Sequence, residues 1–141
     1  MIKTYLSSIF ILFTTISFGQ SVRDFKTKSS SNEVERTQIL NLARTEIRND
    51  IHQEVVFVVD YFKVSGSYAW FEGTVQRKDG QKLDFPSDYY DCCHAEGLFI
   101  KKNGNWTILE FHAFSTDCWY CGISERYPNV PKSILKKDLH Y

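Results

Sequence analysis

The chain has no excess of charge of either sign. Its 141 residues include 17 Lys and Arg and 17 Asp and Glu. Because Lys3 is the only charged residue among the first 19, a chain that began at Gln20 would carry 17 − 1 = 16 basic and 17 acidic side chains. This balance gives no overall attraction to nucleic acid or to acidic membranes, so we expect neither as a partner.

The sequence also lacks internal repeats and the common catalytic motifs. It contains no G-x-S-x-G, no H-E-x-x-H and no glycine loop that could cradle phosphates. Its apolar stretch at residues 6–18 is short and interrupted by Ser and Thr, whereas a membrane-spanning helix needs about 20 apolar residues. We therefore assign no cofactor and expect no membrane anchor.

Residues 1–19 instead have the pattern of a secretory signal peptide. Lys3 supplies the positive charge near the N-terminus, and residues 6–18 form the apolar region. Ser17 and Gly19 are the small residues expected before a cleavage site that precedes Gln20. No cysteine stands at the cut to carry a lipid. The pattern predicts a periplasmic or secreted protein.

The remaining chain predicts one α+β domain. Residues 20–32 are polar and are expected to form a flexible linker ahead of a domain at 33–141. Apolar residues at helical spacing predict a helix over 33–49. Four strands follow, at 54–64, 68–77, 97–102 and 106–114. We expect an N-terminal helix packed on a four-stranded antiparallel meander and held by disulfide bonds.

Strand alternation predicts which side chains share a face of the sheet. A turn at Gly66 would place Asp60 opposite Glu72 and Phe62 opposite Trp70. The side chains expected to meet the helix are Val55, Phe57, Val59, Ala69, Phe71, Val75, Leu109, Phe111 and Ala113. Those expected on the free face are Asp60, Phe62, Trp70, Glu72, Trp106, Ile108, Glu110, His112 and Phe114.

This free face is the first candidate binding surface, because apolar walls with a few polar groups are typical of ligand sites. His112 and Glu110 are of the types needed for acid–base catalysis, but no nucleophile motif accompanies them. The ordinary polar side of a sheet is the alternative.

Four cysteines form two close pairs, Cys92–Cys93 and Cys118–Cys121. In an exported chain they are expected to form disulfide bonds. Strand pairing around Gly104 brings the first pair close to the level of the second, so we expect two crossed bridges that join the loop 80–96 to the C-terminal tail. A zinc site with His94 as a spare ligand and a Cys118/Cys121 dithiol for disulfide exchange are alternatives; we expect no bound metal.

The loop 80–96 combines acidic and aromatic residues. It has no EF-hand spacing for calcium. Exposed tyrosines give large contact area at low entropic cost, so the loop is a second candidate binding surface. Its members of interest are Asp84, Phe85, Asp88, Tyr89, Tyr90, Asp91 and Glu96.

Several segments resemble a group of small exported bacterial α+β domains, mostly uncharacterised, with a cystatin-like or nuclear-transport-factor-like shape. The segments are 39–47 (ILNLARTEI), 55–64 (VVFVVDYFKV), 68–80 (YAWFEGTVQRKDG) and 98–111 (LFIKKNGNWTILEF), followed by Thr116, Asp117 and Pro131. The resemblance implies a helix on a curved sheet. It implies no established activity and no catalytic residue.

The expected export, the expected disulfide bonds and the absence of a catalytic motif together favour a small binding domain. Its partner would be another envelope or extracellular protein, which the domain would serve as an inhibitor, immunity or accessory factor. One alternative is a small hydrolase or isomerase that uses His112 and Glu110. The other is a disulfide-exchange protein that uses Cys118 and Cys121.

Overall fold

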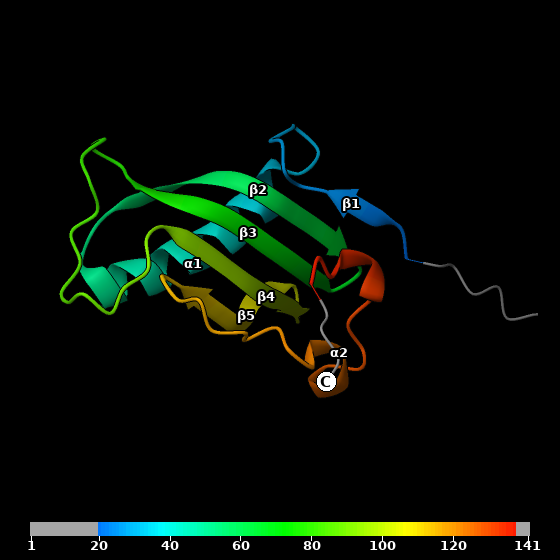
Figure 1. Cartoon of the computed structure of the whole chain (residues 1–141). Helices are drawn as coiled ribbons and strands as arrows, with labels where there is room; N and C mark the ends of the chain where they lie inside the picture. Colours follow the sequence, from blue (N-terminus) through cyan, green and yellow to red (C-terminus); the bar gives the residue numbers. More distant parts are fainter. Residues whose placement is uncertain (1–19, 138–141) are drawn as a thin grey trace, which may run out of the picture.

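The chain folds around one antiparallel sheet in a computed structural model that describes residues 20–137 (Figure 1). The predicted signal peptide at 1–19 and the last four residues lie outside the described part. The strands are neighbours in chain order, β1-β2-β3-β4-β5. The elements are β1 (Val22–Asp24), α1 (Glu33–Ile51), β2 (Val55–Ser65), β3 (Tyr68–Arg77), β4 (His94–Lys102), β5 (Asn105–Ala113), α2 (Ile123–Arg126) and the 3-10 helix η1 (Lys132–Ile134).

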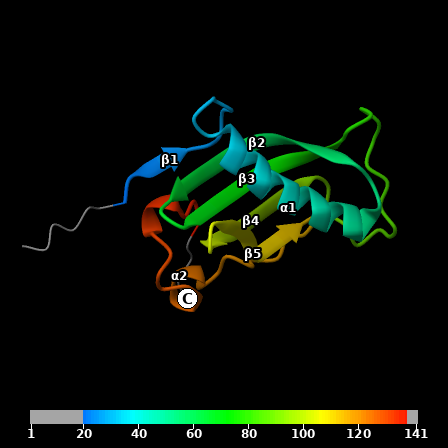
Figure 2. The same cartoon turned by 180° about the vertical axis from the view of Figure 1, so that it is seen from behind.

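The sheet is covered on both faces. Helix α1 crosses one face, as Figure 2 shows, and the C-terminal segment with α2 and η1 lies on the other (Figure 1). We call the first set of buried contacts the helix-side core; it contains Ile39, Leu40, Ala43 and Ile47 of α1, with Phe71 and Phe99 of the sheet among others. We call the second the tail-side core; its buried members are Trp70, Leu98, Trp119, Ile123, Val130 and Ile134. In the span 20–137, no helix is both long and apolar enough to cross a membrane.

The α+β class and the helix packed on an antiparallel meander are confirmed, but the sheet has five strands rather than four. The additional strand, β1, lies in the segment expected to be a flexible linker and pairs with β2, from Val22 opposite Ser65 to Asp24 opposite Lys63. Phe25 follows it and is 1% exposed. A three-residue polar strand carries too short a pattern to be recognised in the sequence.

A β-bulge at Asp60 changes the predicted pairing of β2 with β3. Val59 pairs with Gly73 as the turn at Gly66 predicts, but Tyr61 then pairs with Glu72 and Phe62 with Phe71. The expected pairs Asp60–Glu72 and Phe62–Trp70 are therefore wrong. The extra residue moves Phe62 into the helix-side core, where it is fully buried.

A second bulge, at Leu109, has the same effect on β5. Leu98 pairs with Glu110, whereas Phe99 pairs with Ile108. Trp106 and Ile108 consequently belong to the helix-side core instead of the predicted free face, and Leu109 packs in the tail-side core. Phe114 also packs in the helix-side core, but it lies just beyond the end of β5, where its positive φ of 57° ends the strand alternation. Four of the predicted residues do share the tail side of the sheet: Trp70, Glu72, Glu110 and His112.

The contact of β1 with the sheet yields a stability prediction. The Phe25 ring packs edge-on against Phe62, with 5.4 Å between ring centroids. We expect Phe25→Ala to lower the free energy of unfolding by about 3–5 kcal/mol, measured by urea denaturation, because it removes a buried ring. Val22→Ala in β1, the strand just before Phe25, is the control; its side chain is 40% exposed, and the change should cost less than about 1 kcal/mol. Equal, small effects of both changes would show that the segment is not part of the cooperative fold.

Candidate functional site

Two buried glutamates form the centre of the tail side of the sheet. Glu72 of β3 and Glu96 of β4 are directly opposite each other in the strand pairing. They are 1% and 4% exposed. We call them the acid pair. Like charges at this position repel, and a buried charge is costly without a partner, so the pair needs compensation from elsewhere in the chain.

The compensation comes from two lysines that follow η1. Lys136 Nζ lies 2.6 Å from Glu72 Oε2. Lys137 Nζ lies 3.0 Å from Glu96 Oε2 and 3.9 Å from Glu72 Oε1, so it sits between the two carboxylates. The indole N–H of Trp70 also donates to Glu72 Oε1, at 3.1 Å. Two positive charges thus match two negative ones.

Glu96 is held in its ionised form. Burial alone would raise the pKa of this carboxyl, but interactions with His94, Trp119 and Lys137 outweigh it and lower the pKa from 4.5 to about 2. His94 Nε2 is 3.2 Å from Glu96 Oε2. In return, Glu96 raises the pKa of Lys137 against the opposing effect of burial.

Trp119 joins the acid pair to the two residues considered for acid–base chemistry. Its ring stacks on Trp70 on one side, at 5.1 Å, and on His112 on the other, at 5.1 Å and 11° between planes. His112 Nε2 is 3.6 Å from Glu110 Oε2, and Glu110 Oε1 accepts a hydrogen bond of 2.9 Å from Arg126. Glu110 and His112 are therefore both engaged by the C-terminal segment.

The cysteines pair within each sequence neighbourhood. The structure joins Cys92 to Cys93 and Cys118 to Cys121, so the expected crossed bridges are wrong. Cys92 and Cys93 line a hollow of about 530 Å³ beside Val75 and Leu83, which belong to the helix side. Cys118 and Cys121 lie in the segment that covers the opposite face, so the sheet separates the two pairs.

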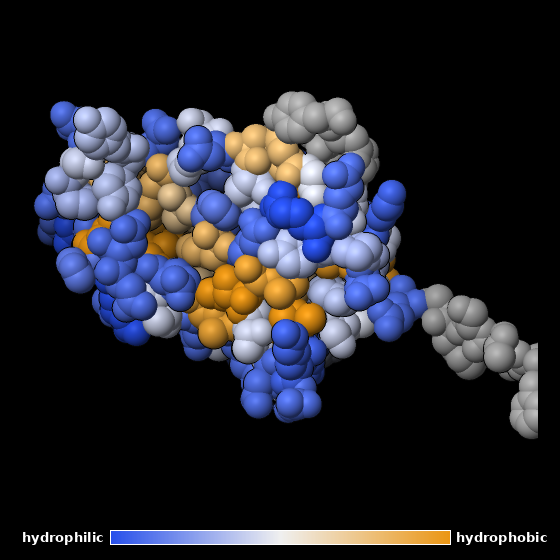
Figure 3. Space-filling view, turned by 90° about the horizontal axis from the view of Figure 1, so that it is seen from below, coloured by the Kyte–Doolittle hydropathy of each residue, from blue (hydrophilic) through white to orange (hydrophobic). Residues whose placement is uncertain are grey.

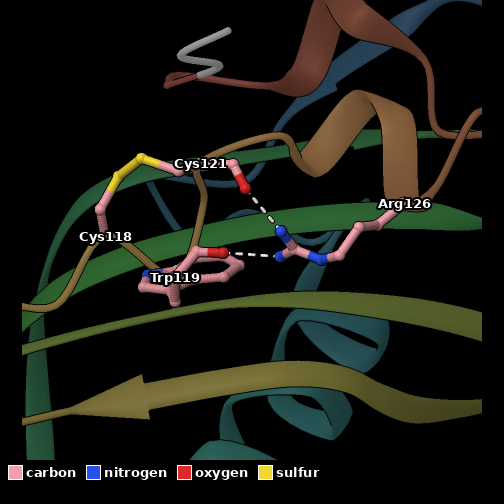
Figure 4. The surroundings of a disulfide bond; sticks show 4 residues. All are labelled: Cys118, Trp119, Cys121 and Arg126. Atoms are coloured by element: carbon pink, nitrogen blue, oxygen red, sulfur yellow. Dashed lines mark hydrogen bonds between the residues drawn. A yellow bond between two sulfur atoms is a disulfide. The ribbon is translucent and has the colours of Figure 1, made fainter. Parts of the chain in front are cut away.

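Arg126 fixes the turn that contains the second pair. Its guanidinium donates to the carbonyl oxygens of Trp119, at 2.6 Å, and Cys121, at 2.5 Å. Figure 4 shows the guanidinium between these two carbonyls, with the disulfide on the far side of the turn. The turn thereby presents Trp119 to the sheet.

The other predicted binding residues lie apart from the acid pair. Asp60 is exposed and accepts a hydrogen bond from Thr74 Oγ1, at 3.2 Å. Tyr89 is 94% exposed. Tyr90 is held in place, because its hydroxyl donates to Asp50 Oδ1 at 2.9 Å and its ring stacks on Phe85. The loop that carries Tyr89 and Tyr90 projects from the opposite end of the sheet from η1 (Figure 1).

Glu96 and the residues around the acid pair were not predicted to form a site from the sequence. Glu96 was expected only as an acidic loop residue and His94 only as a spare zinc ligand. The other residues that the sequence did not reveal are Trp119, Arg126, Lys136 and Lys137. A usable signal was present in the strands, where single glutamates interrupt the apolar runs at Glu72 and Glu96. A buried charge of this kind implies a partner elsewhere in the chain.

Comparison with known proteins finds no relative. No protein-family model matches the chain, no curated protein is similar to it, and no solved structure matches its fold.

The cysteine pairing can be tested by peptide mapping without reduction. Tryptic cleavage would separate residues 83–101, with Cys92 and Cys93, from residues 103–126, with Cys118 and Cys121. We expect each peptide alone to be lighter by two hydrogen atoms than its reduced form, because each bridge is internal. The reduced and alkylated digest is the control. A single species that contains both peptides would contradict the local pairing.

The low pKa of Glu96 predicts a pH dependence of stability. Because folding lowers this pKa from 4.5 to about 2, its contribution is fully present above pH 4.5 and is lost as the pH falls toward 2. We expect Glu96→Gln to remove this component, so that the free energy of unfolding falls less between these pH values than in the unmodified protein. Urea denaturation across the range measures it. Glu46→Gln, on the exposed side of α1, is the control, and a Glu96→Gln curve parallel to that of the unmodified protein would contradict the prediction.

Proposed function

We propose that the chain is a small exported domain, periplasmic or secreted, that binds another envelope or extracellular protein. Inhibitor, immunity and accessory roles all belong to this class. The observation that carries the proposal is the contrast between the two candidate surfaces. The C-terminal segment covers the polar face of the sheet, whereas the loop at 80–93 displays Tyr89 with 94% of its surface exposed.

The loop is anchored in a way that suits recognition. Phe85 packs against Phe114 at 5.0 Å and stacks on Tyr90 at 5.4 Å, and the Tyr90 hydroxyl is bonded to Asp50. These contacts reduce the freedom of the free loop, so less entropy is lost when a partner binds. The exposed acidic residues around Tyr89 favour a partner with a basic rim. They are Asp84, Asp88 and Asp91.

An apolar area lies near the middle of one side of the molecule. Seen from below, the molecule exposes a continuous group of apolar atoms flanked by polar ones (Figure 3). The edge strand β5 runs along this side in Figure 1, and its half-buried apolar residues include Ile108, Leu109 and Phe111. Because Phe114 at the end of β5 contacts Phe85, a partner that binds Tyr89 can reach this strand as well.

The two alternative functions receive less support. A hydrolase or isomerase would need Glu110 and His112 free to meet a substrate, but Arg126 bonds one and Trp119 stacks on the other. A disulfide-exchange thiol is usually activated at the start of a longer helix. Here the C-x-x-C turn precedes α2, which has only four residues.

Capture by the mature domain tests the proposal. Residues 20–141 would be immobilised and exposed to an envelope extract, captured proteins identified by mass spectrometry, and the affinity then measured with the purified partner. We expect one stoichiometric partner and a loss of about tenfold or more in affinity with Tyr89→Ala, as for an aromatic interface anchor.

Val34→Ala is the matched control, because Val34 is 70% exposed on α1 and away from the loop. It should leave the affinity unchanged. No saturable partner, or equal binding by the Tyr89→Ala and Val34→Ala variants, would contradict recognition through the loop.

A further inference from the structure

We propose that Glu72, His94 and Glu96 form a site for a divalent metal ion, with zinc as the best match, in which the lysine ammonium groups are exchangeable occupants. This site is independent of the proposed protein-binding loop. It differs in its ligands from a cysteine zinc site, and it departs from the sequence-based expectation of no bound metal.

The three side chains converge from neighbouring strands. Each offers one ligand atom, and these atoms lie within 4.8 Å of one another. His94 and Glu96 are two residues apart on β4 and therefore point to the same face, and Glu72 is the direct partner of Glu96 on β3. Two carboxylates and one imidazole are common zinc ligands, and a tetrahedral ion would hold their atoms about 3.4 Å apart. Small side-chain rotations supply this contraction.

A cationic group already occupies the space between the carboxylates. Lys137 Nζ lies 3.0 Å from one and 3.9 Å from the other, and both glutamates are more than nine-tenths buried. The site is thus built to hold positive charge. Two lysines bring the same total charge as one divalent ion, so their exchange leaves the charge of the site unchanged.

Two buried nitrogens face the acid pair and make no other hydrogen bond. They are Nε2 of His94, which lies 3.2 Å from Glu96 Oε2, and Nε1 of Trp119. Trp119 is 7% exposed and interacts with Glu96 through its side chain. An imidazole nitrogen this close to a carboxylate oxygen is placed to ligate a metal ion together with it, and the indole N–H could donate to a water molecule bound to that ion.

The lysines can leave the carboxylates when a divalent ion takes over the compensation of their charge. Their side chains are 42% and 33% exposed, and they follow η1 near the end of the chain. Lys136 and Lys137 can extend into solvent while Ile134 remains buried in the tail-side core. Metal binding would therefore release the lysines without opening the fold.

Titration calorimetry with zinc chloride at pH 7.5 tests the site. The protein is the mature chain, shown by thiol titration to be fully oxidised so that cysteines cannot bind the metal. We expect saturable binding of one ion. The Lys136→Met/Lys137→Met double variant should bind about tenfold more tightly or better, because the competing ammonium groups are gone, and Glu96→Gln or His94→Ala should weaken binding by a similar factor or more.

His52→Asn is the matched control, since His52 is an exposed histidine at the far end of α1, and it should bind zinc like the unmodified protein. Thermal melting establishes that each variant is folded; if the double variant unfolds, Lys137→Met replaces it. Absence of saturable binding in both the unmodified and the lysine variants would overturn the proposal. Binding that survives both Glu96→Gln and His94→Ala would overturn it too. Neither result bears on capture through Tyr89, which is measured separately.

Discussion

Glu72 and Glu96 are buried side by side in the middle of the sheet, and most of the tail side of the molecule is arranged around this fact. Their charges are matched by lysines 64 and 41 residues away in the sequence. The same segment brings Trp119, Ile123, Val130 and Ile134 to the sheet, so apolar burial and charge compensation favour one position of the C-terminal segment. Apolar contacts alone are non-directional, whereas the ion pairs require particular atoms to meet.

The stacked rings of Trp70, Trp119 and His112 connect the acid pair to the edge strand β5. Trp119 lies between Trp70 and His112, and Arg126 holds the backbone of the turn that carries it. The residues that seemed free for chemistry in the sequence are thereby part of the packing. A sheet face rich in charged and aromatic side chains is in this protein an internal surface. This is why we propose the loop at the other end of the sheet, and not this face, as the recognition surface.

The helix could be predicted from apolar residues at helical spacing, and the four longer strands from runs of β-branched and aromatic residues between turn residues. The face of the sheet on which Phe62 and Trp106 lie could not be predicted. Single-residue bulges at Asp60 and Leu109 reverse the alternation of side chains between the two faces. It could also not be predicted that the C-terminal segment covers the tail side of the sheet. The apolar residues of the C-terminal segment are spaced irregularly, and the meaning of Glu72 and Glu96 depends on lysines that only the fold brings near. The predicted pairing of β4 with β5, which placed the cysteine pairs near each other along the strands, was close to correct. Strand pairing does not determine on which face of the sheet a loop lies, and the two cysteine pairs lie on opposite faces.

The late position of the lysines has a consequence for how the protein acquires its structure. Synthesis proceeds from the N-terminus, so β3 and β4 are complete before Lys136 and Lys137 exist, because β4 ends at Lys102, 34 residues before Lys136. Until then, pairing β3 with β4 brings the carboxylates of Glu72 and Glu96 together without the lysines, on a face of the sheet that the C-terminal segment does not yet cover. The buried residues of the helix-side core all lie at or before Phe114, whereas the opposite layer closes only after the segment with Lys136 and Lys137 has been made. The positions of these charges along the chain therefore favour one order of folding. A chain truncated shortly before Lys136 would have all five strands but no stable cover on the tail side of the sheet.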